Sequence, residues 1–145
     1  ALSRPVGGAV GPFNVAEAPP IVVARRLIRR NCPRCAVEHR VPDEILLKMG
    51  VKAPELPEFK RVKKGEGCEE CSGSGLRGRL AIFEMMRMTP RIKEGVYKKA
   101  SMFEIKRYAI EDGMRTLRQS ALLKLKAGVT TVEEVLNTTV ADDLT

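Results

Sequence analysis

The sequence contains no tryptophan, and aromatic residues of all kinds make up only 4% of its 145 residues. Leucine, isoleucine, valine and methionine must therefore fill the core. Aliphatic runs are short, far below the roughly 20 apolar residues that a membrane-spanning helix needs. No N-terminal segment combines positive charge with an apolar stretch as a signal peptide does. We therefore expect neither an integral membrane protein nor a secreted precursor.

Acidic residues are also in the minority, 18 against 26 lysines and arginines, which gives a formal net charge of +8. Such an excess can indicate nucleic acid, an acidic lipid surface or an acidic protein as partner. Few aromatic residues stand among the basic ones, which disfavours single-stranded nucleic acid, whose bases stack on rings. The composition, 43% hydrophobic and 30% charged, is that of a soluble globular protein.

The four cysteines form two pairs, each with two residues between its members: Cys32 with Cys35, and Cys68 with Cys71. Two such pairs can each present two thiolates on one turn and together surround a tetrahedral metal. Two disulfides are an alternative, but nothing else indicates an oxidising compartment. A thioredoxin-like redox site needs only one such pair. The sequence predicts a structural Zn²⁺ held by these four cysteines, with His39 left as a surface histidine.

The 32 residues between the pairs predict a short helix over 42–50, a loop over 51–58 and a strand over 59–63. Three glycines in 72–79 match the spacing of a dinucleotide fingerprint, but no strand directly precedes them and no helix opens on them. We interpret them as backbone that wraps around the metal and turns into a strand. That strand, 79–86, is apolar at alternate and adjacent positions, which predicts burial on both faces.

From residue 89 onward the pattern becomes helical. Pro90 suits the first position of one helix, and Ser101 with Glu104 predicts the capping box of a second. Thr116 is expected to cap a third helix, and Thr130 with Glu133 repeats the capping pattern before a fourth. Their apolar stripes predict a compact helical bundle.

A further helix is expected from Pro20 to Asn31, directly before the first cysteine pair. Most of its surface would be basic, through Arg25, Arg26, Arg29 and Arg30. These arginines are candidate docking residues for a negative surface, and a merely solvated face is the alternative. The predicted fold is thus α+β and predominantly helical, with a small zinc-bound subdomain containing a short strand pair, followed by the helical bundle.

Several stretches together resemble the C-terminal region of the type II secretion and type IV pilus-assembly ATPases. They are residues 11–16, 24–29, the two cysteine pairs with the glycine-rich segment 73–79, residues 83–84, 113–118 and 127–136. The resemblance covers about residues 10–138. This sequence departs from the family at Arg25, where glutamine is usual, and at Ala81, where glycine is usual.

The resemblance implies a cytoplasmic hexameric motor, peripheral at the inner membrane, whose RecA-like core uses ATP and Mg²⁺ to drive pseudopilus or pilus assembly. Its partners would be neighbouring subunits and an inner-membrane platform or anchor protein. The phosphate-binding loop G-x-x-x-x-G-K-[ST] does not occur in these residues. We therefore expect residues 1–31 to end the catalytic core, 32–88 to form the zinc subdomain and 89–145 the helical subdomain, with no catalytic residue in this piece alone. The sequence starts without methionine, as a piece of something larger would.

Two other classes remain open. Cys68, Cys71 and the glycines after them equal one unit of the co-chaperone cysteine repeat, although the first pair lacks such glycines. A zinc ribbon that binds nucleic acid is the other, supported by the positive charge. Steep weakening of DNA or RNA binding with salt would identify the latter.

Overall fold

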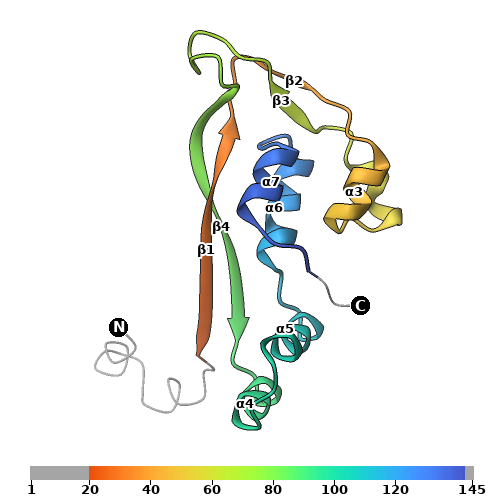
Figure 1. Cartoon of the computed structure of the whole chain (residues 1–145), viewed down its shortest axis with the longest axis vertical. Coiled ribbons are helices and arrows are strands. Elements are labelled where there is room, and N and C mark those ends of the chain that lie inside the picture. The colour runs from red at the N-terminus through yellow and green to blue at the C-terminus, as the bar shows by residue number, and fades with distance from the viewer. Residues whose placement is uncertain (1–19, 143–145) are drawn as a thin grey trace, which may run out of the picture. The chain divides into compact units, whose positions relative to one another are not determined.

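The computed structural model describes residues 20–142, and the expectations for residues 1–19 and 143–145 lie outside that range. Its elements follow in chain order (Figure 1): β1 (Ile21–Asn31), β2 (Ala36–Glu38), α3 (Asp43–Met49), the 3₁₀ helix η1 (Ala53–Glu58), β3 (Lys63–Gly65), β4 (Leu76–Arg87), α4 (Pro90–Tyr97), α5 (Met102–Glu111), α6 (Leu117–Lys126) and α7 (Val132–Thr138). Helices and two small two-stranded sheets make the chain α+β. Across residues 20–142, no helix has the length and apolarity needed to cross a membrane.

The predicted basic helix over residues 20–31 is wrong, because this segment is strand β1. It pairs with β4, and the two arrows run in opposite directions in Figure 1. Backbone hydrogen bonds of 2.9 Å continue the pairing at both ends, from Met88 to the carbonyl of Pro20 and from Cys32 to that of Gly75. Three β-branched residues begin the strand, and such side chains favour extended backbone. Strand pairing, rather than the spacing of arginines, therefore determines the conformation.

The described chain divides into two compact units. The first contains residues 20–23 and 85–114, and the second contains residues 24–84 and 115–142. In the first unit the expected helix starts are confirmed, since the hydroxyls of Thr89 and Ser101 accept the backbone N–H groups that open α4 and α5. Its core consists of Ile92, Ile105 and Ala109 with partly buried neighbours.

The second unit has the larger core, to which α3, α6 and α7 contribute. The helix expected over 42–50 is confirmed as α3, and Gly50 ends it with φ of 108°. Part of the expected loop over 51–58 is instead η1. The strand expected over 59–63 is displaced to β3, which pairs antiparallel with β2 and places Lys64 opposite Val37.

The expected caps of the last two helices have different outcomes. Thr116 caps α6 as expected, and Gln119 completes a reciprocal capping box with it. Helix α7 is capped by Thr131, not Thr130, and the backbone N–H of Glu134 is the donor. The Thr130 hydroxyl instead donates to the carbonyl of Arg29 at 2.8 Å, so tertiary contact takes this threonine away from the cap.

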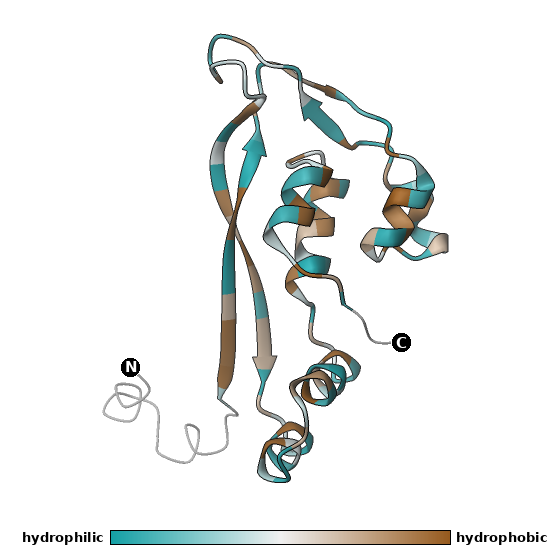
Figure 2. Cartoon of the chain, in the orientation of Figure 1, coloured by the Kyte–Doolittle hydropathy of each residue, from teal (hydrophilic) through white to brown (hydrophobic). Residues whose placement is uncertain are grey.

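Burial of β4 on both faces is also a wrong expectation. Ile82 is buried, but Phe83 and Met85 remain 42% and 55% exposed. Figure 2 shows hydrophobic stretches on β4 and at the start of β1. Successive side chains of a strand point to opposite faces, so the face of β4 that carries Phe83 and Met85 is the one left exposed.

Candidate metal centre

The fold brings the four cysteines together from two distant parts of the second unit. Cys32 follows β1 and Cys35 precedes β2, while Cys68 and Cys71 lie between β3 and β4. Their sulfur atoms all lie within 4.8 Å of one another. The separations are 3.7 Å for Cys32–Cys68, 3.8 Å for Cys35–Cys71 and 3.7 Å for Cys68–Cys71. All four are free thiols, so neither of the disulfides considered from sequence is present.

These separations match the coordination sphere of a tetrahedral metal. Four sulfurs about 2.3 Å from a zinc ion lie about 3.8 Å from one another, which is the edge of that tetrahedron. Thiolates are soft ligands and favour zinc or iron over calcium or magnesium. The donor set and its geometry therefore fit a structural Zn²⁺.

Backbone N–H groups point at two of the sulfurs. The Cys71 sulfur accepts from the backbone of Cys68 at 3.2 Å and of Gly75 at 3.1 Å, and the Cys35 sulfur accepts from Gly67 at 3.3 Å. Burial raises the pKa of the Cys71 thiol, but these N–H donors and the neighbouring thiols outweigh it and lower the pKa. At Cys35 burial dominates over the Gly67 donor and raises the pKa. The loop thus favours the thiolate that a metal requires at Cys71 before any ion adds its own charge.

Glycines let the chain cross itself beside the sulfurs. A Cβ on Gly65 would lie 2.1 Å from the Gly75 carbonyl oxygen, and one on Gly67 would lie 2.8 Å from that of Gly73. Gly75 also has φ of 76°, a left-handed conformation that favours glycine. These glycines shape the cysteine loop and direct the Gly75 N–H at the Cys71 sulfur, and the wrapping of residues 72–79 around a metal stays a prediction.

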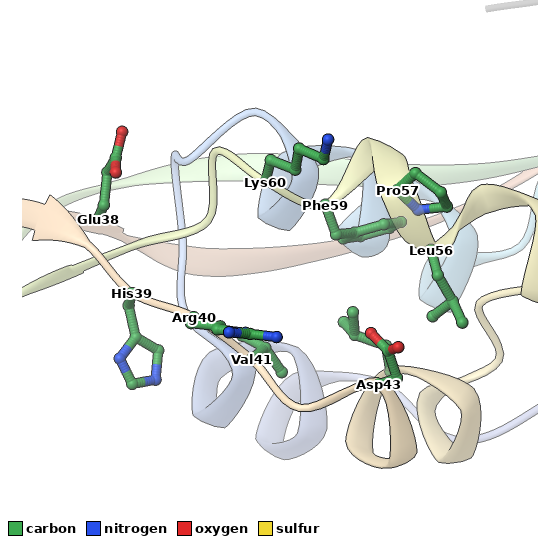
Figure 3. A pocket seen from close by; sticks show the side chains of 10 residues that line it. Glu38, His39, Arg40, Val41, Asp43, Leu56, Pro57, Phe59 and Lys60 are labelled. Atoms are coloured by element: carbon green, nitrogen blue, oxygen red, sulfur yellow. The ribbon is translucent and has the colours of Figure 1, made fainter.

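His39 lies apart from the sulfur cluster. It lines a cavity of about 740 Å³. Figure 3 shows His39 and Glu38 at one end of this cavity and Pro57, Phe59 and Leu56 at the other. Among the described residues, the four cysteines are the grouping of possible ligands that the fold assembles.

The four candidate docking arginines have different surroundings. On a strand successive side chains point to opposite faces, so Arg25 and Arg29 share one face and Arg26 and Arg30 the other. Arg29 is bound to Glu134: its backbone N–H donates at 2.8 Å to one carboxylate oxygen, and its guanidinium donates at 3.0 and 3.2 Å to the other. The Glu134 side chain is only 6% exposed. Arg29 is therefore paired within the second unit, and because its side chain is still 58% exposed, its docking role stays a prediction.

Sequence reasoning missed two buried polar residues that bond near the end of β1, Glu134 and Asn31. Glu134 stands 105 residues from its arginine partner, and no local pattern reports such a pair. Asn31 is 5% exposed and directly precedes Cys32. The hydrogen bonds of its side-chain amide go to Lys63 and Gly128, which are too far away in the sequence for a local pattern to predict.

Comparison with known proteins identifies the family of the chain. Residues 1–137 match the family described as type II/IV secretion system protein. The chain is 40% identical over 131 residues to a type IV pilus assembly ATPase PilB of Thermus thermophilus, covering 90% of this chain and 15% of that protein. It is 38% identical over 142 residues to PilB of Myxococcus xanthus, covering 97% of this chain and 25% of the relative.

A type II secretion system protein E of Aeromonas hydrophila is 30% identical over 142 residues, covering 98% of this chain and 28% of that protein. The chain thus spans between about one seventh and about two sevenths of the length of these relatives. Because the family match extends over almost all of its residues, the chain belongs to the type II/IV secretion system protein family.

Proposed function

We propose that this chain is the C-terminal portion of a hexameric cytoplasmic ATPase that powers assembly of a type IV pilus or of a type II secretion pseudopilus. The observation that carries the proposal is the 40% identity over 131 residues to a protein named as a pilus assembly ATPase. ATP and Mg²⁺ would bind upstream, because these 145 residues contain no phosphate-binding loop with its lysine.

Within that parent, the role of the chain is structural and coupling. Residues 1–31 would end the catalytic core, residues 32–88 would form the metal-bound segment and residues 89–145 the helical end. Cys32, Cys35, Cys68 and Cys71 would hold Zn²⁺, and their mutual distances and free thiols support this assignment. A bound zinc ion supplies a rigid cross-link without redox chemistry. It would fix the end of β1 to the start of β4 across a long intervening segment.

The proposed partners are neighbouring subunits of the hexamer and a platform or anchor protein at the cytoplasmic face of the inner membrane. The relatives that support this are named for pilus assembly and for type II secretion. Exposed arginines on β1 offer positive charge for such contacts.

The metal assignment is tested by replacing Cys68 with serine. We expect Cys68→Ser to lower the melting temperature sharply and to abolish stoichiometric zinc, because structural zinc sites contribute about 10 kcal/mol or more in isolated finger peptides. Elemental analysis for zinc and iron, with thermal denaturation, measures both effects. His39→Ala is the matched control and should retain zinc. Purified wild-type chain without metal would overturn the assignment.

The place of the metal in the motor is tested in the full-length parent. Cys68→Ser should abolish pilus assembly or secretion while nucleotide binding by the upstream core persists. Normal pili or secretion in a zinc-free variant would show that the coupling role is wrong.

A further inference from the structure

The turn between α6 and α7, residues 128–131, packs against both chain segments that lead into the cysteine pairs; we call it the clasp turn. In Figure 1, α6 and α7 are joined by this turn. The first lead-in segment is the end of β1, before Cys32, and the second is residues 61–63, before Cys68. All of these residues belong to the second unit.

Asn31 joins the three segments directly. Its backbone N–H donates to the Val129 carbonyl at 2.8 Å. Its side-chain amide donates to the carbonyl of Lys63 at 2.9 Å and to that of Gly128 at 3.1 Å. The Asn31 side-chain oxygen is buried with no partner among residues 20–142, so the contribution of this side chain lies in its N–H donors. One residue next to a metal ligand thus bonds the clasp turn and the second lead-in segment.

Arg29 and Thr130 form a second connection on the same strand end. The Thr130 hydroxyl donates to the Arg29 carbonyl at 2.8 Å, and Thr130 is fully buried. Glu134 on α7 accepts the backbone N–H and the guanidinium of Arg29. Helix α7 is therefore hydrogen-bonded to the strand that ends at the first cysteine.

The backbone of the clasp turn also lies in close contact with the second lead-in segment. A Cβ on Gly128 would lie 2.7 Å from the Arg61 carbonyl oxygen, and Gly128 has φ of 81°. The clasp turn therefore contacts the second lead-in segment through a glycine that another residue could replace only with strain. Lys64 and Glu133 add an exposed ion pair at 3.3 Å on the same side.

We propose that the clasp turn positions the two cysteine pairs, so that metal binding and the docking of α7 stabilise each other. The inference rests on the metal site of the proposed function. If docking of α7 increases metal affinity by some factor, metal binding must favour docking of α7 by the same factor. Asn31 is then a positioning residue of the metal centre, although it offers no ligand to the ion.

The test measures zinc affinity and local opening in the whole chain. Zinc affinity is obtained by competition with a chromophoric chelator, and opening of α7 by hydrogen exchange of its amides with and without zinc. Asn31→Ala removes the side-chain hydrogen bonds that join the clasp turn and the two lead-in segments, so it should weaken zinc binding by about tenfold. It should also remove most of the zinc-dependent protection of α7, while exchange in α4 and α5 stays independent of zinc.

Thr130→Val is the milder variant in case Asn31→Ala does not fold. It keeps the buried volume and removes only the hydroxyl donor to Arg29, and should give a smaller loss of zinc affinity in the same direction. Thr89→Val is the matched control, because its hydroxyl bonds Ile92 and Asp112 within the first unit and touches neither α7 nor a lead-in segment. This control should retain wild-type zinc affinity.

The proposal would be wrong if Asn31→Ala and Thr130→Val both kept wild-type zinc affinity. It would also be wrong if zinc did not change the hydrogen exchange of the α7 amides. Equal weakening by Thr89→Val would also overturn it, since general destabilisation would then account for the effect. Failure of the wild-type chain to bind zinc would instead contradict the metal site of the proposed function.

Discussion

At the scale of single residues, the cysteine loop depends on positions where a side chain has no room. Gly75 meets two constraints at once, because it has a left-handed φ and an added Cβ would lie 2.4 Å from the Gly65 carbonyl oxygen. Gly73 in the same loop also has a left-handed φ, of 81°, but a Cβ added there would meet no atom within 4 Å. Comparing Gly75 with Gly73 therefore separates the cost of backbone strain from the cost of steric collision.

We expect Gly75→Ala to destabilise the chain more than Gly73→Ala does. Strain alone costs about 1–2 kcal/mol for a non-glycine residue in this region, which is the full expected effect at Gly73. In Gly75→Ala the backbones of residues 65 and 75 must also move apart. This movement displaces the N–H of residue 75 from the Cys71 sulfur. Thermal denaturation and zinc content measure the difference. Equal losses in the two variants would contradict the crossing of Gly65 and Gly75.

Residue-level prediction from the sequence succeeded where the pattern is local. The spacing of two residues within each pair of cysteines predicted the grouping that the fold assembles. The partners Asn31 and Glu134 could not be predicted, because their bonds join segments about 32 to 105 residues apart. Such pairs depend on the final packing of α7 and leave no periodic signal.

At the scale of elements, helices were predicted more accurately than strands for a physical reason. Caps at Thr89, Ser101 and Thr116 act within a few residues, so their sequence signals are nearly complete. Strand β1 depends on β4, which lies more than forty residues later in the chain. The spacing of its two arginine pairs is compatible with one face of a helix. Only the pairing with β4 therefore decides between helix and strand for this segment.

The strand assignment changes which arginine should matter for folding. Arg29→Gln removes the guanidinium from a Glu134 carboxylate that is almost fully buried, while the backbone N–H of residue 29 still donates to it. We expect a loss of about 1–3 kcal/mol in unfolding free energy, the range for leaving a buried acceptor poorly satisfied. Arg26→Gln is the control on the opposite face and should change stability little. Urea denaturation of both variants measures this, and equal stabilities would show that the Arg29–Glu134 pair is unimportant.

At the scale of the whole molecule, nucleotide chemistry should be absent from the isolated chain. The glycine-rich segment lies in the cysteine loop, where the Gly75 N–H donates to sulfur and cannot cradle a phosphate at the same time. We expect no ATP binding by calorimetry and no ATP hydrolysis. Micromolar binding that is lost on replacing Gly75 or Gly78 would contradict this prediction.

Docking to a negatively charged partner is the function that we propose for the basic strand. Arg25, Arg26 and Arg30 are exposed and form no ion pair within residues 20–142, whereas Arg29 is held by Glu134. Four thiolates with one Zn²⁺ carry a formal charge of only about −2, so the metal centre would not require all of this positive charge. We propose that these three arginines face a negative surface, either on a neighbouring subunit or on a membrane platform protein of the parent.

Reversing Arg26 and Arg30 to glutamate tests that assignment, because these two share one face of β1 and leave the Arg29–Glu134 pair untouched. In the full-length parent the double variant should impair assembly or stimulated ATPase activity, since like charges would then meet at the contact. Zinc content and melting temperature should stay at wild-type values, which separates lost docking from lost folding. A matched Arg26→Gln and Arg30→Gln protein, which removes charge without reversing it, should show a smaller defect. Normal pili or secretion with the glutamate variant would mean that this face is only solvated.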